Sequence, residues 1–377
     1  MDSTETGVVS SSTPVIIPTD TASGLECHSF AGVNRILNLE PYFLVDNIGR
    51  NIEVWRFEKD GIEPSERRWY DRTSCPREIP SLLDVDLHAA FLRGGGHELL
   101  TVDHYGRLWH FALRPSAVQM RPTCEMQLLG DVERFVMAND CFIGSSPRGH
   151  ATDDAAQPGI FLFAPLPRSL PTASGVTRLA CDQALADWGA ITALGVSASA
   201  TRLAVGAGTR LGVFALHASD TGVKIGPCAW EANVAFESQW LHIGDDALWA
   251  GGFRPSPSAE SGDWNACRGG SIEVFAIDSG ARTRAIDLPE ETAWGYGADP
   301  VVLAPDYRRA YVLGCDASLH VVDIRKRVTR QLYASPLGRE EGDLSLGIGH
   351  ADLRDKWLYA GFSRGGFRLF RYDLDQD

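Results

Sequence analysis

Apolar and polar residues alternate along most of this chain in short runs, which glycine, aspartate, asparagine and serine interrupt. The stretch GSIEVFAID is one such run, and close variants of it return along the sequence. In chain order, the copies lie at 49–57, 106–113, 159–166, 210–216, 270–278, 318–324 and 366–374. An alternation of period two predicts β-strands that bury one face. We therefore expect a strand at each of these copies.

A second apolar run precedes each copy and ends in small or polar residues. These runs lie at 42–46, 98–103, 141–145, 202–208, 247–253, 309–316 and 356–363. A third run often comes before the second, as in ITALGV (191–196). The whole unit returns about every 50 residues, and units of roughly this length with three or four short strands are typical of β-propellers.

We therefore predict an all-β fold, a seven-bladed β-propeller with four-stranded antiparallel blades. A pair of β-sandwiches is the alternative, but it gives no reason for the same unit to repeat seven times. The last copy leaves little chain for an outer strand, whereas TPVIIP (13–18) precedes the first blade. An unpaired last blade would expose a row of backbone groups, so we expect 13–18 to pair with 365–374 and close the ring. The predicted domains are a disordered tail at 1–12 and a single propeller domain at 13–377.

Composition narrows the classes of partner. The chain has 377 residues, of which 44% are hydrophobic and 22% charged, as in a folded soluble protein. Its formal net charge of −14 disfavours a phosphate backbone, and its longest basic run is Arg325-Lys326-Arg327. No apolar run approaches the roughly 20 residues of a membrane-spanning helix, and the N-terminal residues do not resemble a secretory signal. We expect no nucleic-acid partner and no membrane partner.

Candidate chemistry is sparse. The eight cysteines form no Cys-x-x-Cys pair, which disfavours a zinc site, and we interpret them as reduced thiols of an intracellular protein, cytoplasmic or nuclear. The sequence contains no phosphate-binding loop, no His-Glu-x-x-His motif and no Gly-x-Ser-x-Gly motif. We therefore predict no catalytic residue, no bound cofactor and no metal site, and expect that the chain is not an enzyme.

Two segments carry a resemblance to a known family. PVVLAPDYRRAYVLGCDASLHVVDI (300–324) reads as strand, Pro-Asp turn, strand, short turn and strand with a Val-Asp ending, and 191–216 has the same layout. This pattern resembles a WD-repeat unit, and the resemblance extends over roughly residues 30–374. Val322-Asp323 stands nearest to the Trp-Asp dipeptide, which no copy contains, and Gly349-His350 resembles the Gly-His element. The resemblance implies a propeller with an adaptor-like role, a scaffold subunit that binds other proteins.

One face of the predicted propeller combines long loops with aromatic residues. The connection between the second and third strands is long in two blades, at 146–158 and 254–268, and such connections share a face with the links between blades. Trp, Tyr and Arg supply much of the binding energy of protein interfaces, and loops on a rigid scaffold often carry function. We place a protein-binding face there. Its expected residues, in the links and in the matching turns, are Trp69, Trp188, Trp240, Trp294, Tyr296, Arg50, Arg107 and Arg364.

Other interpretations stay open at this point. Each tryptophan could instead be a buried plug between blades, and the arginines could pair with blade aspartates such as Asp46 and Asp103. A propeller enzyme, such as a lactonase or another metal-dependent hydrolase, would gather carboxylates and histidines around the central channel. The candidates for that site are Asp84, Asp86, His88 and Glu133. A lectin that binds glycans or small molecules is a third possibility, favoured by the exposed aromatics alone.

Overall fold

The structure is a computed structural model, and it describes most of the chain's central part together with strands elsewhere. The described stretches are 134–146, 159–165, 181–219, 222–254, 269–290, 292, 300–304, 306–314 and 318–333. Outside them, the structure describes the strands at 15–18, 33–39, 42–47, 51–56, 68–71, 87–93, 98–103, 107–112, 124–127, 177–178, 345–352, 357–362 and 366–371.

Antiparallel sheets account for most of the described residues, and most neighbouring strands within a sheet follow one another in the sequence. Sheet 1 contains β2 (Val33–Leu39), β3 (Tyr42–Asn47), β4 (Asn51–Arg56) and β5 (Arg68–Asp71). Sheet 2 contains β6 (Leu87–Arg93), β7 (Glu98–Asp103), β8 (Arg107–Ala112) and β9 (Cys124–Gln127), with β13 (Thr177–Arg178) parallel to β9. Sheet 3 contains β10 (Arg134–Ala138), β11 (Cys141–Ser146), β12 (Gly159–Phe163) and β14 (Cys181–Ala184).

The remaining sheets repeat this order. Sheet 4 contains β15 (Ala193–Val196), β16 (Arg202–Ala207), β17 (Arg210–Ser219) and β18 (Gly222–Asn233). Sheet 5 contains β19 (Glu237–Ile243), β20 (Ala247–Phe253), β21 (Gly270–Ala276) and β22 (Arg282–Leu288). Sheet 6 contains β23 (Val301–Leu303), β24 (Arg309–Leu313), β25 (Leu319–Asp323) and β26 (Val328–Tyr333). Sheet 7 contains β27 (Ser345–Asp352), β28 (Trp357–Phe362) and β29 (Gly366–Arg371), with β1 (Val15–Pro18) beside β29.

The alternating pattern therefore predicted the strands well. β4, β8, β12, β17, β21, β25 and β29 fall on the copies of the opening pattern, and each is the third strand of its sheet. The runs that precede the copies are the second strands. An all-β fold of four-stranded antiparallel sheets is confirmed, and within the described residues the one helical element is the short 3-10 helix η5 (Ala186–Trp188).

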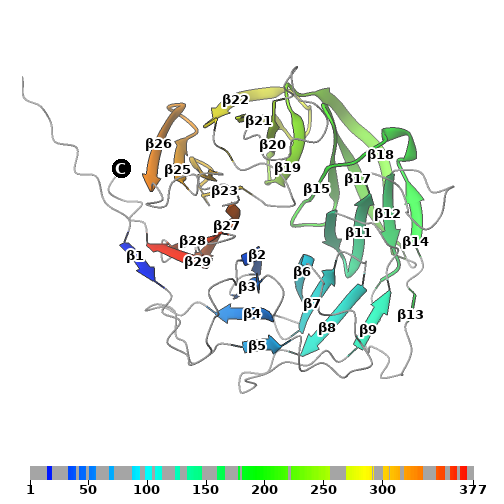
Figure 1. Cartoon of the computed structure of the whole chain (residues 1–377). Coiled ribbons are helices and arrows are strands. Elements are labelled where there is room, and N and C mark those ends of the chain that lie inside the picture. The colour runs from blue at the N-terminus through cyan, green and yellow to red at the C-terminus, as the bar shows by residue number, and fades with distance from the viewer. Residues whose placement is uncertain are drawn as a thin grey trace, which may run out of the picture.

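The predicted pairing of the N-terminal strand is also present. β1 lies antiparallel to β29, with Ile16 opposite Phe370 and Ile17 opposite Leu369. The strand thus takes the fourth position of sheet 7, where the chain itself supplies no later strand among the described residues. Figure 1 shows β1 next to β29, and the sheets arranged around a common centre with β2, β6, β15, β23 and β27 on their inner side.

The connections divide each sheet into two ends. In an antiparallel sheet of this order, the first–second and third–fourth turns lie together, and we call this the hairpin end. The second–third turn lies at the opposite end with the link to the next sheet, and we call this the link end. Backbone hydrogen bonds confirm that the two features meet there, since Val234 N donates to Thr209 O at 2.9 Å and Ser238 N donates to Gly208 O at 2.9 Å.

The core lies between successive sheets. Sheets 4 and 5 share a buried cluster that includes Leu211, Val213, Leu248 and Phe275, and sheets 5 and 6 share another that includes Ile272, Val274, Val312 and Val322. Burial of each such side chain contributes about 2 kcal/mol. The faces of sheet 5 are thus both covered, which fixes its position between its neighbours.

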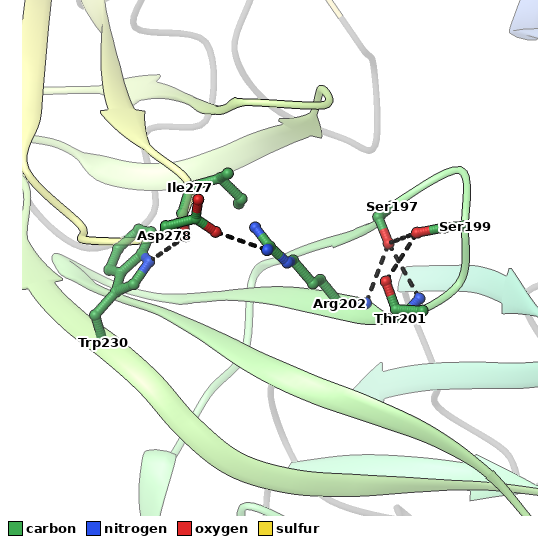
Figure 2. Close-up of polar contacts among 7 residues, drawn as sticks. All are labelled: Ser197, Ser199, Thr201, Arg202, Trp230, Ile277 and Asp278. Atoms are coloured by element: carbon green, nitrogen blue, oxygen red, sulfur yellow. Dashed lines mark hydrogen bonds and ion pairs between the residues drawn. The ribbon is translucent and has the colours of Figure 1, made fainter.

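Polar contacts join the same sheets at the hairpin end. Trp230 of β18 donates from Nε1 to the carbonyl oxygen of Ile277 at 2.7 Å, and Arg202 Nη2 lies 2.7 Å from Asp278 Oδ1. Figure 2 shows both contacts reaching from sheet 4 to the turn that follows β21. This turn ends at Gly280, whose φ of 67° is left-handed and whose Cα faces the Trp230 ring. We call this contact the 4/5 joint.

Candidate functional site at the link end

The described part of the chain places the predicted tryptophans in three different positions. Trp188 is the last residue of η5, in the link between sheets 3 and 4, as predicted. Trp69 lies within β5, the fourth strand of sheet 1, and Trp240 lies within β19, the first strand of sheet 5. The prediction that all four tryptophans occupy equivalent links is therefore wrong for Trp69 and Trp240. The polar residues around Trp240 in ESQWLHI concealed a strand whose side chains face other sheets.

The other predicted residues lie at the limits of what the structure describes. Arg107 is the first residue of β8, directly after a second–third turn, as predicted. The side chains of Arg107 and Trp69 lie outside the described residues, as do Trp294, Tyr296, Arg50 and Arg364. The two long connections begin after Ser146 and Phe253 and end before Gly159 and Gly270, so they join second to third strands as expected. Binding by these residues stays a prediction.

Trp188 forms a stack with a charged residue, Arg210, which is absent from the predicted site. The indole is 8% exposed and packs edge-on against Phe214, with 5.2 Å between ring centroids. The guanidinium carbon of Arg210 lies 3.9 Å above the indole centroid, a geometry in which a cation is attracted to the ring. The close approach depends on Gly212, because a Cβ there would lie 2.4 Å from Trp188 Cη2. Trp188 is thus a platform for Arg210 rather than an exposed contact residue.

The carboxylate of Glu231 holds the Arg210 side chain over the indole. Arg210 Nε and Nη2 lie 3.1 and 2.9 Å from Glu231 Oε2, on the neighbouring strand β18. The Arg210 side chain is 38% exposed and that of Glu231 44%. The indole on one face and the carboxylate at one edge restrict the guanidinium to few conformations before a partner binds. Binding therefore costs less conformational entropy, which favours it.

A second arginine connects three sheets at the same end. Arg134, the first residue of β10 in sheet 3, donates from Nε to Thr192 O at 3.1 Å and from Nη2 to Gln239 Oε1 at 3.5 Å. Thr192 precedes sheet 4 and Gln239 belongs to sheet 5, and Thr192 Oγ1 in turn donates to Ser238 O at 2.5 Å. Arg134 has five N–H donors, and these two contacts occupy two of them among the described residues. The remaining donors suit a carboxylate of a partner.

Trp240 belongs to a different cluster, which lies toward the hairpin end. Its ring stacks on that of His242, with 6.3 Å between centroids and an interplanar angle of 11°. His242 Nε2 lies 3.2 Å from the hydroxyl of Tyr307, and Tyr307 stacks on Trp249 at 5.8 Å and 16°. Burial lowers the pKa of His242, and burial with the nearby charges of Asp245 and Asp246 raises the pKa of Tyr307. We call this aromatic contact between sheets 5 and 6 the 5/6 joint.

The sequence carries a signal for Arg210 in its position beside a turn. Arg210 is the first residue of β17 and follows the Gly208-Thr209 turn, the same position that Arg107 takes before β8. The sequence prediction named Arg107 in this position of sheet 2 and missed Arg210 in the same position of sheet 4. Arg134 carried no such signal, because its partners lie 58 and 105 residues away.

The comparisons with known proteins show the fold and give no family. No family model and no curated protein matches the chain. Its structure is similar to that of the computationally designed Ika8 protein, with 10% sequence identity, a TM-score of 0.50, and coverage of 91% of this chain and 97% of that one. Solved structures of 1548 chains match in all. A fold shared so widely does not indicate one function.

Two kinds of feature are absent from the described residues. No helix there is long and apolar enough to cross a membrane. Within the same residues, no three side chains of His, Cys, Asp or Glu gather as metal ligands would. The carboxylates and the histidine named for a channel enzyme, Asp84, Asp86, His88 and Glu133, have side chains outside the described part.

Proposed function

We propose that the chain is a seven-bladed WD-repeat-like β-propeller, closed by β1 on β29, which acts inside the cell as a non-catalytic scaffold or adaptor subunit. Its partner is a protein or peptide that binds at the link end. The pairing of β1 with β29 and the four-stranded sheets around a common centre support the propeller. A ring of blades covers its own strand edges and is a rigid support for binding loops.

The observation that carries the proposed binding is the Arg210 stack. The guanidinium of Arg210 lies over an indole, donates from two nitrogens to one carboxylate oxygen, and belongs to a side chain that is 38% exposed. These contacts preorganise it for binding. Arg and Trp are among the residues that dominate interface energies. Arg134 lies at the same end and, among the described residues, contacts only Thr192 and Gln239, so it extends the surface toward the inner strands. A partner that offers carboxylates to these two arginines would bind them in bidentate geometry.

Affinity purification from native cells, followed by mass spectrometry, tests this proposal with a matched pair of variants. Arg210→Ala removes the stacked guanidinium at the link end. Arg202→Ala removes a guanidinium of similar exposure, 36%, from an ion pair at the hairpin end. We expect Arg210→Ala to reduce recovery of the bound protein more than about fivefold, which corresponds to about 1 kcal/mol of binding free energy. Arg202→Ala should leave the recovery unchanged.

Two results would contradict the proposal. Equal recovery by Arg210→Ala and the wild-type protein, with both folded, would exclude the link-end surface. A stoichiometric metal in the purified protein, together with hydrolysis of a lactone or ester, would favour the channel enzyme and contradict a non-catalytic scaffold.

A further inference from the structure

Sheet 6 brings together two turns that are about fifteen residues apart in the sequence. The first–second turn runs over 306–308 and the third–fourth turn over 324–327, both at the hairpin end. Ile324 N donates to Arg308 O at 2.9 Å, and Arg309 pairs with Asp323 across β24 and β25. The side chains at the tips of the two turns therefore share one surface.

Aspartates shape both turns and leave the basic residues at their tips. Asp306 Oδ1 accepts from Arg308 N at 2.9 Å, whereas Asp323 Oδ1 accepts from Arg325 N at 2.9 Å and Lys326 N at 2.8 Å. The hydrogen bond from the Lys326 backbone is the main cause that lowers the pKa of Asp323. Aspartates engaged in this way with their own turns compete weakly for the basic side chains, and the two ion pairs there are long, each 3.7 Å.

The same surface exposes apolar side chains. Within the described part of the chain, the large hydrophobic residues that stand exposed are Tyr307 and Val328, at 38% and 56%. Tyr307 lies in the first turn, Val328 is the first residue of β26 directly after the second turn, and the basic residues lie between them. We call this surface the sheet 6 corner, and its residues are Tyr307, Arg308, Arg325, Lys326, Arg327 and Val328.

We propose that the sheet 6 corner is a docking surface for an acidic segment of a partner protein that also carries apolar side chains. Four cations gather here, although the chain as a whole has a formal net charge of −14. They attract an acidic segment and steer it to this surface. The apolar flanks receive the segment's own apolar residues. The exposed carboxylates of Asp245 and Asp246 adjoin Tyr307 on the side of sheet 5, so the acidic stretch lies over Arg325, Lys326 and Arg327, away from them.

The corner favours a protein over a nucleic acid on two counts. A phosphate backbone offers no apolar group to Val328. The corner also spans only two turns, whereas nucleic-acid surfaces usually extend basic residues along a stripe. The surface lies at the hairpin end, so it is distinct from the link-end site and its variants test it separately.

Fluorescence anisotropy with synthetic probes tests the proposal on the full chain. The probes are a labelled peptide of about ten residues that alternates Glu and Asp with two leucines, the same peptide with Gln and Asn in place of the acids, and a single-stranded oligonucleotide of similar length. The variant is Lys326→Glu with Arg327→Glu. Its matched control, Lys224→Glu with Arg284→Glu, makes the same charge change at exposed positions of β18 and β22.

We expect the acidic peptide to bind the wild-type protein and the control, and to bind the Lys326→Glu, Arg327→Glu variant about tenfold more weakly. Binding should fall with added salt, and Val328→Thr should weaken it with the basic residues intact. The amide peptide should not bind. The proposal is wrong if the acidic peptide does not bind, if it binds both double variants equally, or if the oligonucleotide binds more tightly with the same dependence on Lys326 and Arg327.

Discussion

Sheets 4 and 5 and sheets 5 and 6 meet at the same end of the molecule by different chemistry. The 4/5 joint is directional, since an indole N–H and a guanidinium reach a backbone carbonyl and a carboxylate of one turn (Figure 2). The 5/6 joint is a stack of rings with one hydrogen bond, between His242 and Tyr307. The first depends on the position of a turn, and the second on the protonation and packing of side chains. Equivalent contacts between repeated sheets thus need not respond alike to mutation or pH.

Each joint contains one residue with a left-handed backbone conformation, a glycine in the 4/5 joint and a tyrosine in the 5/6 joint. Gly280, at φ 67°, occupies a conformation that suits glycine and leaves room for Trp230. Tyr307, at φ 54°, occupies one that is costly for a bulky side chain. Its contacts with Trp249 and His242 offset that cost. Sequence and conformation agree in the 4/5 joint, whereas tertiary packing overrides local preference in the 5/6 joint.

The largest effect is expected at Gly280. In Gly280→Ala, the new Cβ would lie 2.6 Å from Trp230 Cδ2 and the left-handed backbone would be strained. We expect a loss of about 3 kcal/mol in the free energy of unfolding, measured by urea denaturation. Gly208→Ala is the control, because Gly208 has φ 56° with nothing within 4 Å, so strain alone costs about 1 kcal/mol. Equal losses would show that the contact with Trp230 does not constrain the turn.

Removal of one hydrogen bond from each joint should lower the free energy of unfolding more at the 4/5 joint than at the 5/6 joint. Trp230→Phe keeps an aromatic ring but leaves the Ile277 carbonyl without its 2.7 Å donor, and we expect a loss of about 1.5 kcal/mol. Tyr307→Phe keeps the stack on Trp249 and removes the hydroxyl at 3.2 Å from His242, and we expect about 0.5 kcal/mol. The same denaturation curves give both values. A larger loss for Tyr307→Phe would reverse the comparison.

Acid should weaken the 5/6 joint before the 4/5 joint. Burial lowers the pKa of His242 in the folded protein below its ordinary value of 6.5, so the unfolded chain binds a proton first as the pH falls. The stability that neutral His242 provides is therefore present above about pH 6.5 and is lost progressively below it. His242→Gln should flatten the dependence of the melting temperature on pH in this range. An unchanged slope in His242→Gln would refute this role.

The smallest effect is expected for the ion pair of the 4/5 joint. The side chains of Arg202 and Asp278 are 36% and 82% exposed, and pairs this exposed contribute little in salt solution. Asp278→Asn should change the free energy of unfolding by about 0.5 kcal/mol or less, and the change should shrink further at high salt. If Asp278→Asn lost as much unfolding free energy as Trp230→Phe, the ion pair would stabilise the 4/5 joint as much as the indole hydrogen bond does, which would contradict this ranking.

The strands could be predicted from sequence because a period of two is written directly in neighbouring residues. The turn chemistry was equally local, as in Gly208 and in the Pro-Asp turn before Arg308. Trp240 was misplaced because Glu237, Gln239 and His242 make its strand look like a loop. The stack of Arg210 on Trp188, and the contacts of Arg134, join residues whose separation in the chain carries no pattern. Such contacts depend on how one sheet is placed against the next.

The proposed closed propeller is tested most directly by two truncations that differ only in β1. Removal of residues 1–20 takes away the strand that pairs with β29, whereas removal of residues 1–12 leaves it. We expect the longer truncation to lower the melting temperature markedly or to aggregate, because the edge of β29 is exposed, and the shorter one to melt like the full chain. If both truncations melt at the temperature of the full chain and stay monomeric, the ring is not closed by β1.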